Sequence, residues 1–355
     1  MSLTGLVALA PPASAHTVSG VGATNWKTAI SAVTPAVPGL TIKVVEQGSR
    51  LELTNHGAEV VVLGYNDEPY LRVGPQGVFR NILSPATYLN CSRQGCPIAP
   101  EANPQAPPDW QKTSSGQTVR WHDHRIHWMG AQPPPVVRRA PGVRHQLAPW
   151  TVTLHQAQNV ITVTGTLTWI PGPSPVPWLF LAAALVVGGL LVGALGAWGL
   201  PLAALTLVLT ANDAYHAWAI GWSAAGGVGA KLGRFFAGSF YSVIGWVLGL
   251  LAVWLLARKR IDGLYAAAFA GVSAALFGGL LDVTTLARSQ APFDGSIGVD
   301  RITVAVSLGL GVGVAAGAVA ALRRQPRMGL VEEDADVEAP AEEPGPGAAP
   351  AGHPA

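Results

Sequence analysis

The strongest constraint on the fold is a set of long apolar segments in the second half of the chain. They run near 177–197, 200–221, 239–257, 263–283 and 301–322. An α-helix needs about 20 consecutive, predominantly apolar residues to cross the hydrocarbon core of a bilayer. Each segment is close to that length, so the sequence predicts an α-helical membrane domain of about five spans within residues 177–327.

The overall composition agrees with a membrane protein and argues against nucleic acid as a partner. Of the 355 residues, 49% are hydrophobic and only 12% are charged, which is more apolar than an ordinary soluble domain. The formal net charge is only +2, and lysine and arginine form no basic stripe of the kind that binds a phosphate backbone. Membrane lipid is therefore the first partner that the sequence predicts.

Basic residues predict the orientation of these spans. Arg258–Arg260 follow the third segment, and Arg323 and Arg324 follow the fifth. Loops rich in lysine and arginine remain in the cytoplasm, so the first span should run from outside to inside. Lys231 and Arg234 fall on the outer side and oppose this rule. The prediction is a multi-pass plasma-membrane protein with an extracytoplasmic N-terminal half and a cytoplasmic C-terminus.

The two ends of the chain carry signals of their own. Residues 1–15 end in Ala-Ser-Ala, a small-x-small pattern typical of signal-peptide cleavage. The apolar stretch before it is short and lacks a basic start, so either the signal is atypical or the true start lies upstream. Cleavage after Ala15 would make His16 the first residue. Residues 328–355 are acidic and rich in Pro, Ala and Gly, which predicts a disordered cytoplasmic tail.

Between these regions, residues 16–170 have the pattern of an all-β sandwich, followed by a proline-rich linker over 171–176. Short alternating or β-branched runs bounded by Gly and Pro are typical of strands. Such runs occur at 40–46, 50–54, 60–63, 70–73, 151–155 and 159–169. The last two predict a closing hairpin around Gln156–Gln158, and many short strands at this spacing favour a sandwich.

The chain has only two cysteines, Cys91 and Cys96, five positions apart. Outside the cytoplasm such a pair most simply forms a loop-closing disulfide. A metal site is the weaker interpretation, because no second cysteine pair accompanies them.

The segment Arg120–Met129, with sequence RWHDHRIHWM, is the sharpest motif. On a β-strand, alternate side chains share a face, so His122 and His124 would point to one side and could hold one metal ion. His127 would then fall on the opposite face unless the strand bends. Neutral imidazole is a favoured ligand of copper and zinc. The alternative is a polar sheet edge whose histidines only make hydrogen bonds.

His16 would strengthen the copper interpretation if it begins the mature chain. Its α-amine and imidazole would chelate one ion, and His122 or His124 would complete a T-shaped site of three nitrogens. Such a site is typical of copper, which leaves zinc as the weaker alternative. The competing interpretation is that cleavage falls elsewhere and His16 is an ordinary residue.

A signal peptide ending at a histidine, a β-sandwich with His-x-His and membrane spans behind it resemble the B subunit of particulate methane and ammonia monooxygenases. The resemblance covers roughly residues 16–200 and implies a cupredoxin-like domain with copper on His16, His122 and His124. That family carries a second such domain after its membrane segment, where this chain has further spans, so the resemblance supports copper more than oxidation. The WHDHRxHWM motif also resembles uncharacterised membrane proteins of actinobacteria.

A blue-copper centre is disfavoured on the same residues. That centre needs a cysteine thiolate together with histidines and usually an axial methionine. Neither Cys91 nor Cys96 is followed within a few residues by histidine or methionine.

A second group of polar residues lies in the predicted second span. Asp213 and His216 are three residues apart and so share a helix face. Ionisable groups inside a membrane are costly and indicate a site or pathway by default. The pair could receive a metal ion or relay protons; the alternative is that both lie in the interfacial zone.

The leading hypothesis from the sequence is a copper-binding membrane protein that captures or transfers copper at the outer face of the plasma membrane. Its partners would be other copper-handling proteins or a membrane complex. A copper-dependent oxidase or monooxygenase-type subunit is the second hypothesis, and a metal-free structural or assembly partner is the third. The sequence leans toward a protein that is not itself an enzyme.

Overall fold

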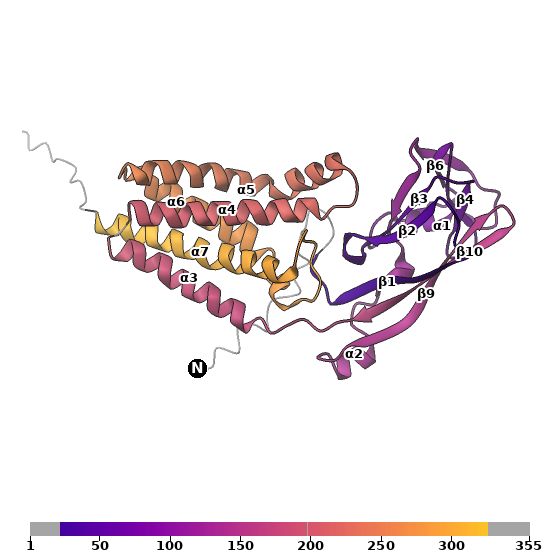
Figure 1. The fold of residues 1–355 in the computed structure, drawn as a ribbon, viewed down its shortest axis with the longest axis horizontal. Helices are drawn as coiled ribbons and strands as arrows, with labels where there is room; N and C mark the ends of the chain where they lie inside the picture. The colour runs from indigo at the N-terminus through magenta and orange to yellow at the C-terminus, as the bar shows by residue number, and fades with distance from the viewer. Residues whose placement is uncertain (1–21, 197, 326–355) are drawn as a thin grey trace, which may run out of the picture.

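The computed structural model describes residues 22–196 and 198–325, and it confirms an antiparallel β domain followed by a helical domain (Figure 1). The predicted signal peptide, His16 and the predicted acidic tail lie outside the described residues. Alternating side chains explain the β domain, because each strand presents one face to a shared core and the other to its surroundings.

The β domain contains ten strands in two sheets. The larger sheet has the order β1-β10-β9-β4-β5-β6-β7 and the smaller one the order β2-β3-β8, and all pairs are antiparallel. The strands are β1 (Trp26–Thr34), β2 (Leu40–Val45), β3 (Arg50–Asn55), β4 (Val60–Leu63), β5 (Pro69–Gly74), β6 (Gly77–Asn81), β7 (Trp110–Ser114), β8 (Thr118–Trp121), β9 (His145–Gln156) and β10 (Asn159–Trp169).

Both sheets contribute to one hydrophobic core. Leu51 and Leu53 from β3 are fully buried in the same cluster as Leu154 of β9 and Ile161 of β10. The predicted closing hairpin is present: Asn159 pairs with Gln156, and Ala157 turns the chain with a positive φ of 51°. Short helices α1 (Pro85–Leu89), η2 (Glu46–Gly48), η3 (His124–Ile126) and α2 (Pro135–Arg139) lie in the connections.

The helical domain is built from long apolar helices. They are α3 (Val176–Ala194), α4 (Leu200–Trp222), α5 (Val228–Ala257), α6 (Asp262–Ser273) and α7 (Ile297–Arg324), with a π-helical turn η4 (Ala274–Leu280) and a 3₁₀ turn η5 (Val283–Ala287) between the last two. Four helical stretches are long and apolar enough to cross a membrane: Val176–Ala194, Val228–Ala257, Asp262–Leu280 and Ile297–Arg324.

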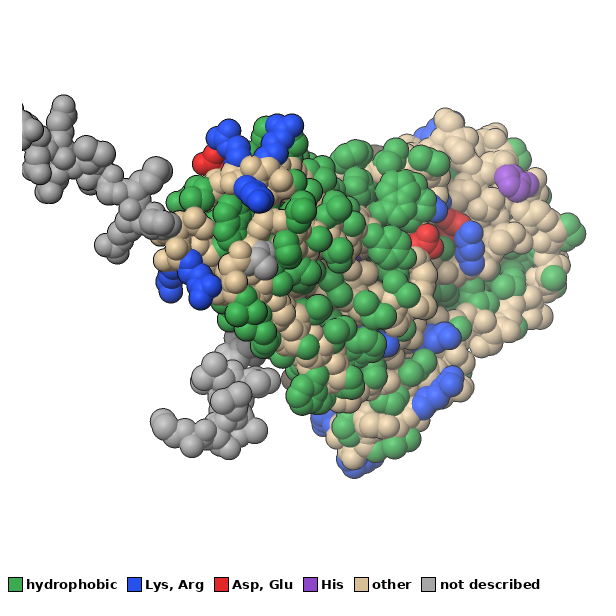
Figure 2. Space-filling view, turned by 60° about the vertical axis from the view of Figure 1, so that its left-hand side comes forward, with side chains coloured by type: hydrophobic (Ala, Val, Ile, Leu, Met, Phe, Trp, Pro, Cys, Tyr) green, Lys and Arg blue, Asp and Glu red, His purple; other side chains and the backbone are tan. Residues whose placement is uncertain are grey.

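The structure therefore supports four of the five predicted spans on length and composition. The exception, α4, carries Asn212, Asp213 and His216, which lower its mean hydropathy, although it lies among the other long helices (Figure 1). Many hydrophobic side chains are exposed on the face of the helical domain that Figure 2 shows. The basic clusters Arg258–Arg260 and Arg323–Arg324 follow the ends of α5 and α7, at the end of the bundle away from the β domain.

The two domains meet through the segment that precedes α7. Thr24 and Gln290 form an antiparallel bridge with N···O distances of 2.8 and 2.9 Å. Next to it, the Asn25 side-chain oxygen accepts a hydrogen bond from the Ser289 backbone N–H at 2.9 Å. These contacts hold the β domain at one end of the helical bundle (Figure 1).

Candidate functional site

The histidines of the RWHDHRIHWM motif do not lie on a strand, so the prediction that His122 and His124 share a strand face is wrong. Strand β8 ends at Trp121, and His124 begins the 3₁₀ turn η3. The reason is the buried Asp123 between them. Its carboxylate accepts hydrogen bonds from Trp121 Nε1 at 3.0 Å, from the Arg125 backbone N–H at 3.1 Å and from the Arg125 guanidinium at 2.7 and 2.8 Å. These bonds turn the chain out of the sheet.

The turn brings His122 together with His127 instead. His122 Nδ1 lies 2.8 Å from the carbonyl oxygen of Ser49, and His127 Nε2 lies 3.0 Å from the same oxygen. The two ring centroids are 6.4 Å apart. The expectation that His127 faces away from His122 is therefore wrong as well. Ser49 follows the tight turn at Gly48, where φ is +89°, and sequence patterns do not reveal which carbonyl a histidine will meet.

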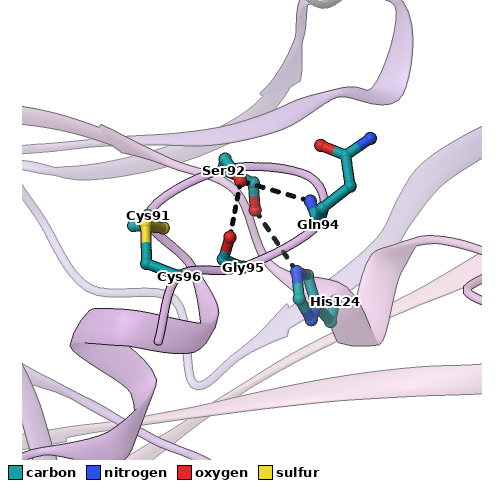
Figure 3. Close-up of a disulfide and its surroundings, with 6 residues drawn as sticks. All are labelled: Cys91, Ser92, Gln94, Gly95, Cys96 and His124. Atoms are coloured by element: carbon teal, nitrogen blue, oxygen red, sulfur yellow. Dashed lines mark hydrogen bonds between the residues drawn. A yellow bond between two sulfur atoms is a disulfide. The ribbon is translucent and has the colours of Figure 1, made fainter. Parts of the chain in front are cut away.

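His124 points to a different neighbour. Its Nε2 lies 3.4 Å from the carbonyl oxygen of Ser92 (Figure 3). Ser92 belongs to the short loop that the Cys91–Cys96 disulfide closes, and its hydroxyl donates to the Gly95 carbonyl at 3.0 Å. The disulfide loop thus helps to fix the position of this imidazole.

Both paired histidines are neutral in the folded protein at pH 7. Burial, together with the positive charge of Arg93, lowers the pKa of His127 to about 4. Burial and the Arg50 guanidinium also hold the pKa of His122 below its ordinary value. Neutral imidazole is the form that binds a metal ion.

The donor chemistry of the three histidines can be compared with that of a copper site. Metal-bound histidines usually donate the second ring N–H to a carbonyl or carboxylate, which fixes the tautomer. Each of the three has one nitrogen near a backbone carbonyl. His122 Nε2 already accepts a hydrogen bond from Arg50 Nε at 3.3 Å, whereas His127 Nδ1 makes no side-chain hydrogen bond with any described residue. His124 Nδ1 is also without a hydrogen bond among the described residues, but His127 is the one that lines the cavity described next, so His127 is the best-placed donor.

The described residues do not complete a metal site by themselves. Within residues 22–196 and 198–325, no group of three or more His, Cys, Asp or Glu side chains has the geometry to hold a metal ion. A cavity of about 20 Å³ lies beside His127, and its wall includes Gly22, Glu46, Ser49 and Arg93. Gly22 and Thr24, which precede strand β1, both line this cavity.

The buried state of His127 predicts a pH dependence in the copper-free protein. Its pKa is near 6.5 in an unfolded chain and about 4 in the folded one. Below pH 6.5 the unfolded state binds a proton that the folded state excludes, so stability falls as the pH drops toward 4. The free energy of unfolding that is lost in this way amounts to about 3 kcal/mol.

Denaturant unfolding at several pH values should show this loss of stability, and His127→Gln should remove the part that His127 causes. The matched variant His155→Gln, at an exposed position, should leave the pH profile of the wild type.

In the helical domain, Asp213 and His216 share the buried face of α4 but have separate partners. Asp213 accepts hydrogen bonds from Trp246 Nε1 at 2.7 Å and from the Ser307 hydroxyl at 3.3 Å. His216 instead contacts two other carboxylates, described below. The sequence singled out the pair, but Trp246 and Ser307 belong to other helices, and their contacts carry no local signal.

Comparison with known proteins adds no identification: no family model, curated protein or solved structure matches this chain.

Proposed function

We propose that this chain is a plasma-membrane copper-binding protein whose β domain lies outside the cell and captures or hands on copper. The observation that carries the proposal is the pair His122 and His127, both neutral and both within hydrogen-bond distance of the Ser49 carbonyl. His127 and Ser49 also line the wall of a cavity. The disulfide and the basic clusters at the far end of the helical bundle support the outside placement.

His16 would complete the site if it begins the mature chain. Six positions separate it from Gly22 at the cavity, and an extended chain of six residues spans at most about 20 Å. Its α-amine and imidazole together with His127 Nδ1 would supply three nitrogens, the donor set that copper favours. His122 would join only if Arg50 gave up its hydrogen bond.

The charges around the site favour a carrier over an enzyme that retains its metal. Arg50 and Arg93 both lower the histidine pKa values, and the same positive charges oppose a bound cation. Copper, when bound, would be held by nitrogen ligands, while the Ser49 carbonyl keeps His127 in the tautomer that leaves Nδ1 free. These charges moderate the affinity, so copper that binds tightly enough to be detected on the protein could still pass to a partner.

Copper affinity should separate the three motif histidines. We expect His127→Gln to weaken copper binding by about 100-fold or more, since outer-shell partners alone are worth about 10- to 100-fold. His122→Gln should have a smaller effect, and His124→Gln and the exposed His155→Gln should have little. The measurement is competition between the purified full-length protein and a chelator of known affinity. Equal affinity in all four variants would contradict the proposed site.

A further inference from the structure

A second arrangement, independent of the copper proposal, surrounds the imidazole of His216. His216 is 2% exposed. Its Nε2 lies 3.2 Å from Asp282 Oδ2, and its Nδ1 lies 2.9 Å from Thr303 Oγ1 and 3.4 Å from Asp300 Oδ1. Both ring nitrogens thus face oxygen atoms inside the bundle.

The hydrogen-bond inventory requires an extra proton at this place. The Thr303 hydroxyl donates to the Asp300 carbonyl at 2.8 Å, so its oxygen is left to accept from His216 Nδ1–H. A neutral imidazole then has no hydrogen on Nε2, and an ionised Asp282 has none either. The contact between them needs one proton, and the imidazole, the stronger base of the two, carries it.

The charged groups around His216 also indicate one bound proton. Three carboxyl groups, those of Asp213, Asp282 and Asp300, share this region with the guanidinium groups of Arg234 and Arg301. Glu46 and Arg50 of the β domain also act on Arg234 with opposite charges. Full ionisation of the three carboxyl groups would therefore leave one negative charge uncompensated. Net charge in an apolar interior is costly, and one bound proton removes it. Asp300 Oδ1 supports this view: it is buried without a hydrogen bond to any described residue, 3.4 Å from the imidazole.

Asp282 provides a route by which the bound proton can exchange with solvent. Its side chain is 24% exposed, against 3% for His216 and for Asp300. A cavity of about 50 Å³ adjoins it, lined by Asp213, His216 and Arg234 among others. The π-helical turn η4 borders this cavity at Gly278, where a Cβ atom would come within 1.7 Å of Asp213 Oδ1.

The ligand that fits is a proton and not a metal ion. The guanidinium of Arg234 lines the cavity, and its Nε and Nη2 are buried without a hydrogen-bond partner among the described residues. A fixed positive charge there repels an incoming cation. Beyond Thr206, the buried residues of α4 are Leu202 and Ala203, so the buried polar side chains of this helix do not continue to its N-terminal end.

We propose that His216 and Asp282, with Asp300 and Thr303 fixing the ring, form a proton-binding site at the β-domain end of the bundle. Asp282 immediately precedes η5 and the segment whose Ser289 and Gln290 contact the β domain. The site therefore binds its proton where the two domains meet.

The test is NMR of the ring nitrogens in full-length, copper-free protein labelled with ¹⁵N-histidine in detergent micelles. At neutral pH the wild type should show one buried ring with protons on both nitrogens, and His216→Gln should remove that signal. Asp282→Asn should convert the ring to the singly protonated form, because the amide can donate to Nε2. The exposed Asp262→Asn should leave the signal unchanged.

Two results would overturn the proposal. One is a His216 ring with a single proton in the wild type, which needs no variant and so stands even if the substitutions unfold the bundle. The other is a doubly protonated ring that persists in Asp282→Asn. Neither result bears on copper binding by the β domain, so the two proposals fail separately.

Discussion

Replacing Asp123 by alanine should lower the free energy of unfolding of the β domain by about 3–5 kcal/mol, the cost of breaking a buried ion pair by removing one partner. Asp123 is fully buried. The Arg125 guanidinium that it binds also donates to the carbonyls of Leu63 and Gly64 at 3.2 and 3.3 Å and lies over the Tyr65 ring. Without the carboxylate, this positive charge loses its hydrogen-bonded anion and retains only the weaker attraction of Glu68.

Denaturant unfolding of the full-length protein, followed by tryptophan fluorescence, measures the effect of Asp123→Ala. The exposed Glu101→Ala in the same domain is the control and should match the wild type. Because Asp123 turns the chain between His122 and His124, the variant should also lose copper affinity. If its stability equals that of Glu101→Ala, the buried pair does not hold the turn.

A leucine at position 193 should separate α3 from α7 and sharply reduce the yield of folded protein. At Gly193 an added Cβ would come within 1.9 Å of the Gly317 carbonyl oxygen, and at Gly189 and Gly309 it would come within 2.5 and 2.4 Å of the backbone of the facing helix. Small residues permit such close packing in membranes. The atom that the leucine would meet belongs to the backbone, so no side-chain rotation relieves the clash. Overpacking alone lowers the stability of a folded protein by about 1–3 kcal/mol or more.

Gly188→Leu is a matched control for Gly193→Leu, because an added Cβ at Gly188 meets nothing within 4 Å. Size-exclusion chromatography in detergent after heating should show early aggregation for the 193 variant and wild-type behaviour for the 188 variant. Equal behaviour of the two would show that the α3–α7 contact does not limit stability.

Local patterns predicted β2, β3, β4, β5, β9, β10 and the long helices, but not β1, β6 and β7. The hairpin of β9 and β10 follows from alternation on either side of Gln156–Gln158, and the long helices follow from apolar length. The third span begins earlier than predicted, at Val228, because Lys231 and Arg234 interrupt the apolar run without ending the helix. The hydropathy pattern reports burial in lipid and not helix ends.

The candidate site depended on contacts that no local pattern contains. His122 and His127 meet through the Ser49 carbonyl, more than 70 positions away in the chain. The strand expectation failed because Arg125 reaches the carbonyls after β4 and draws Asp123 inward. His216 likewise meets Asp282 and Asp300 only when α4 packs against the end of η4 and the start of α7.

The most direct test of the copper proposal is the Cu(II) EPR spectrum of the full-length protein that begins at His16, beside a form with one extra residue before His16. The proposal predicts about one tightly bound copper with coupling to several nitrogens in the first form, loss of tight binding in the second, and loss of one nitrogen in His127→Gln. Absence of tight copper binding in every form, or identical spectra from all three, would contradict it.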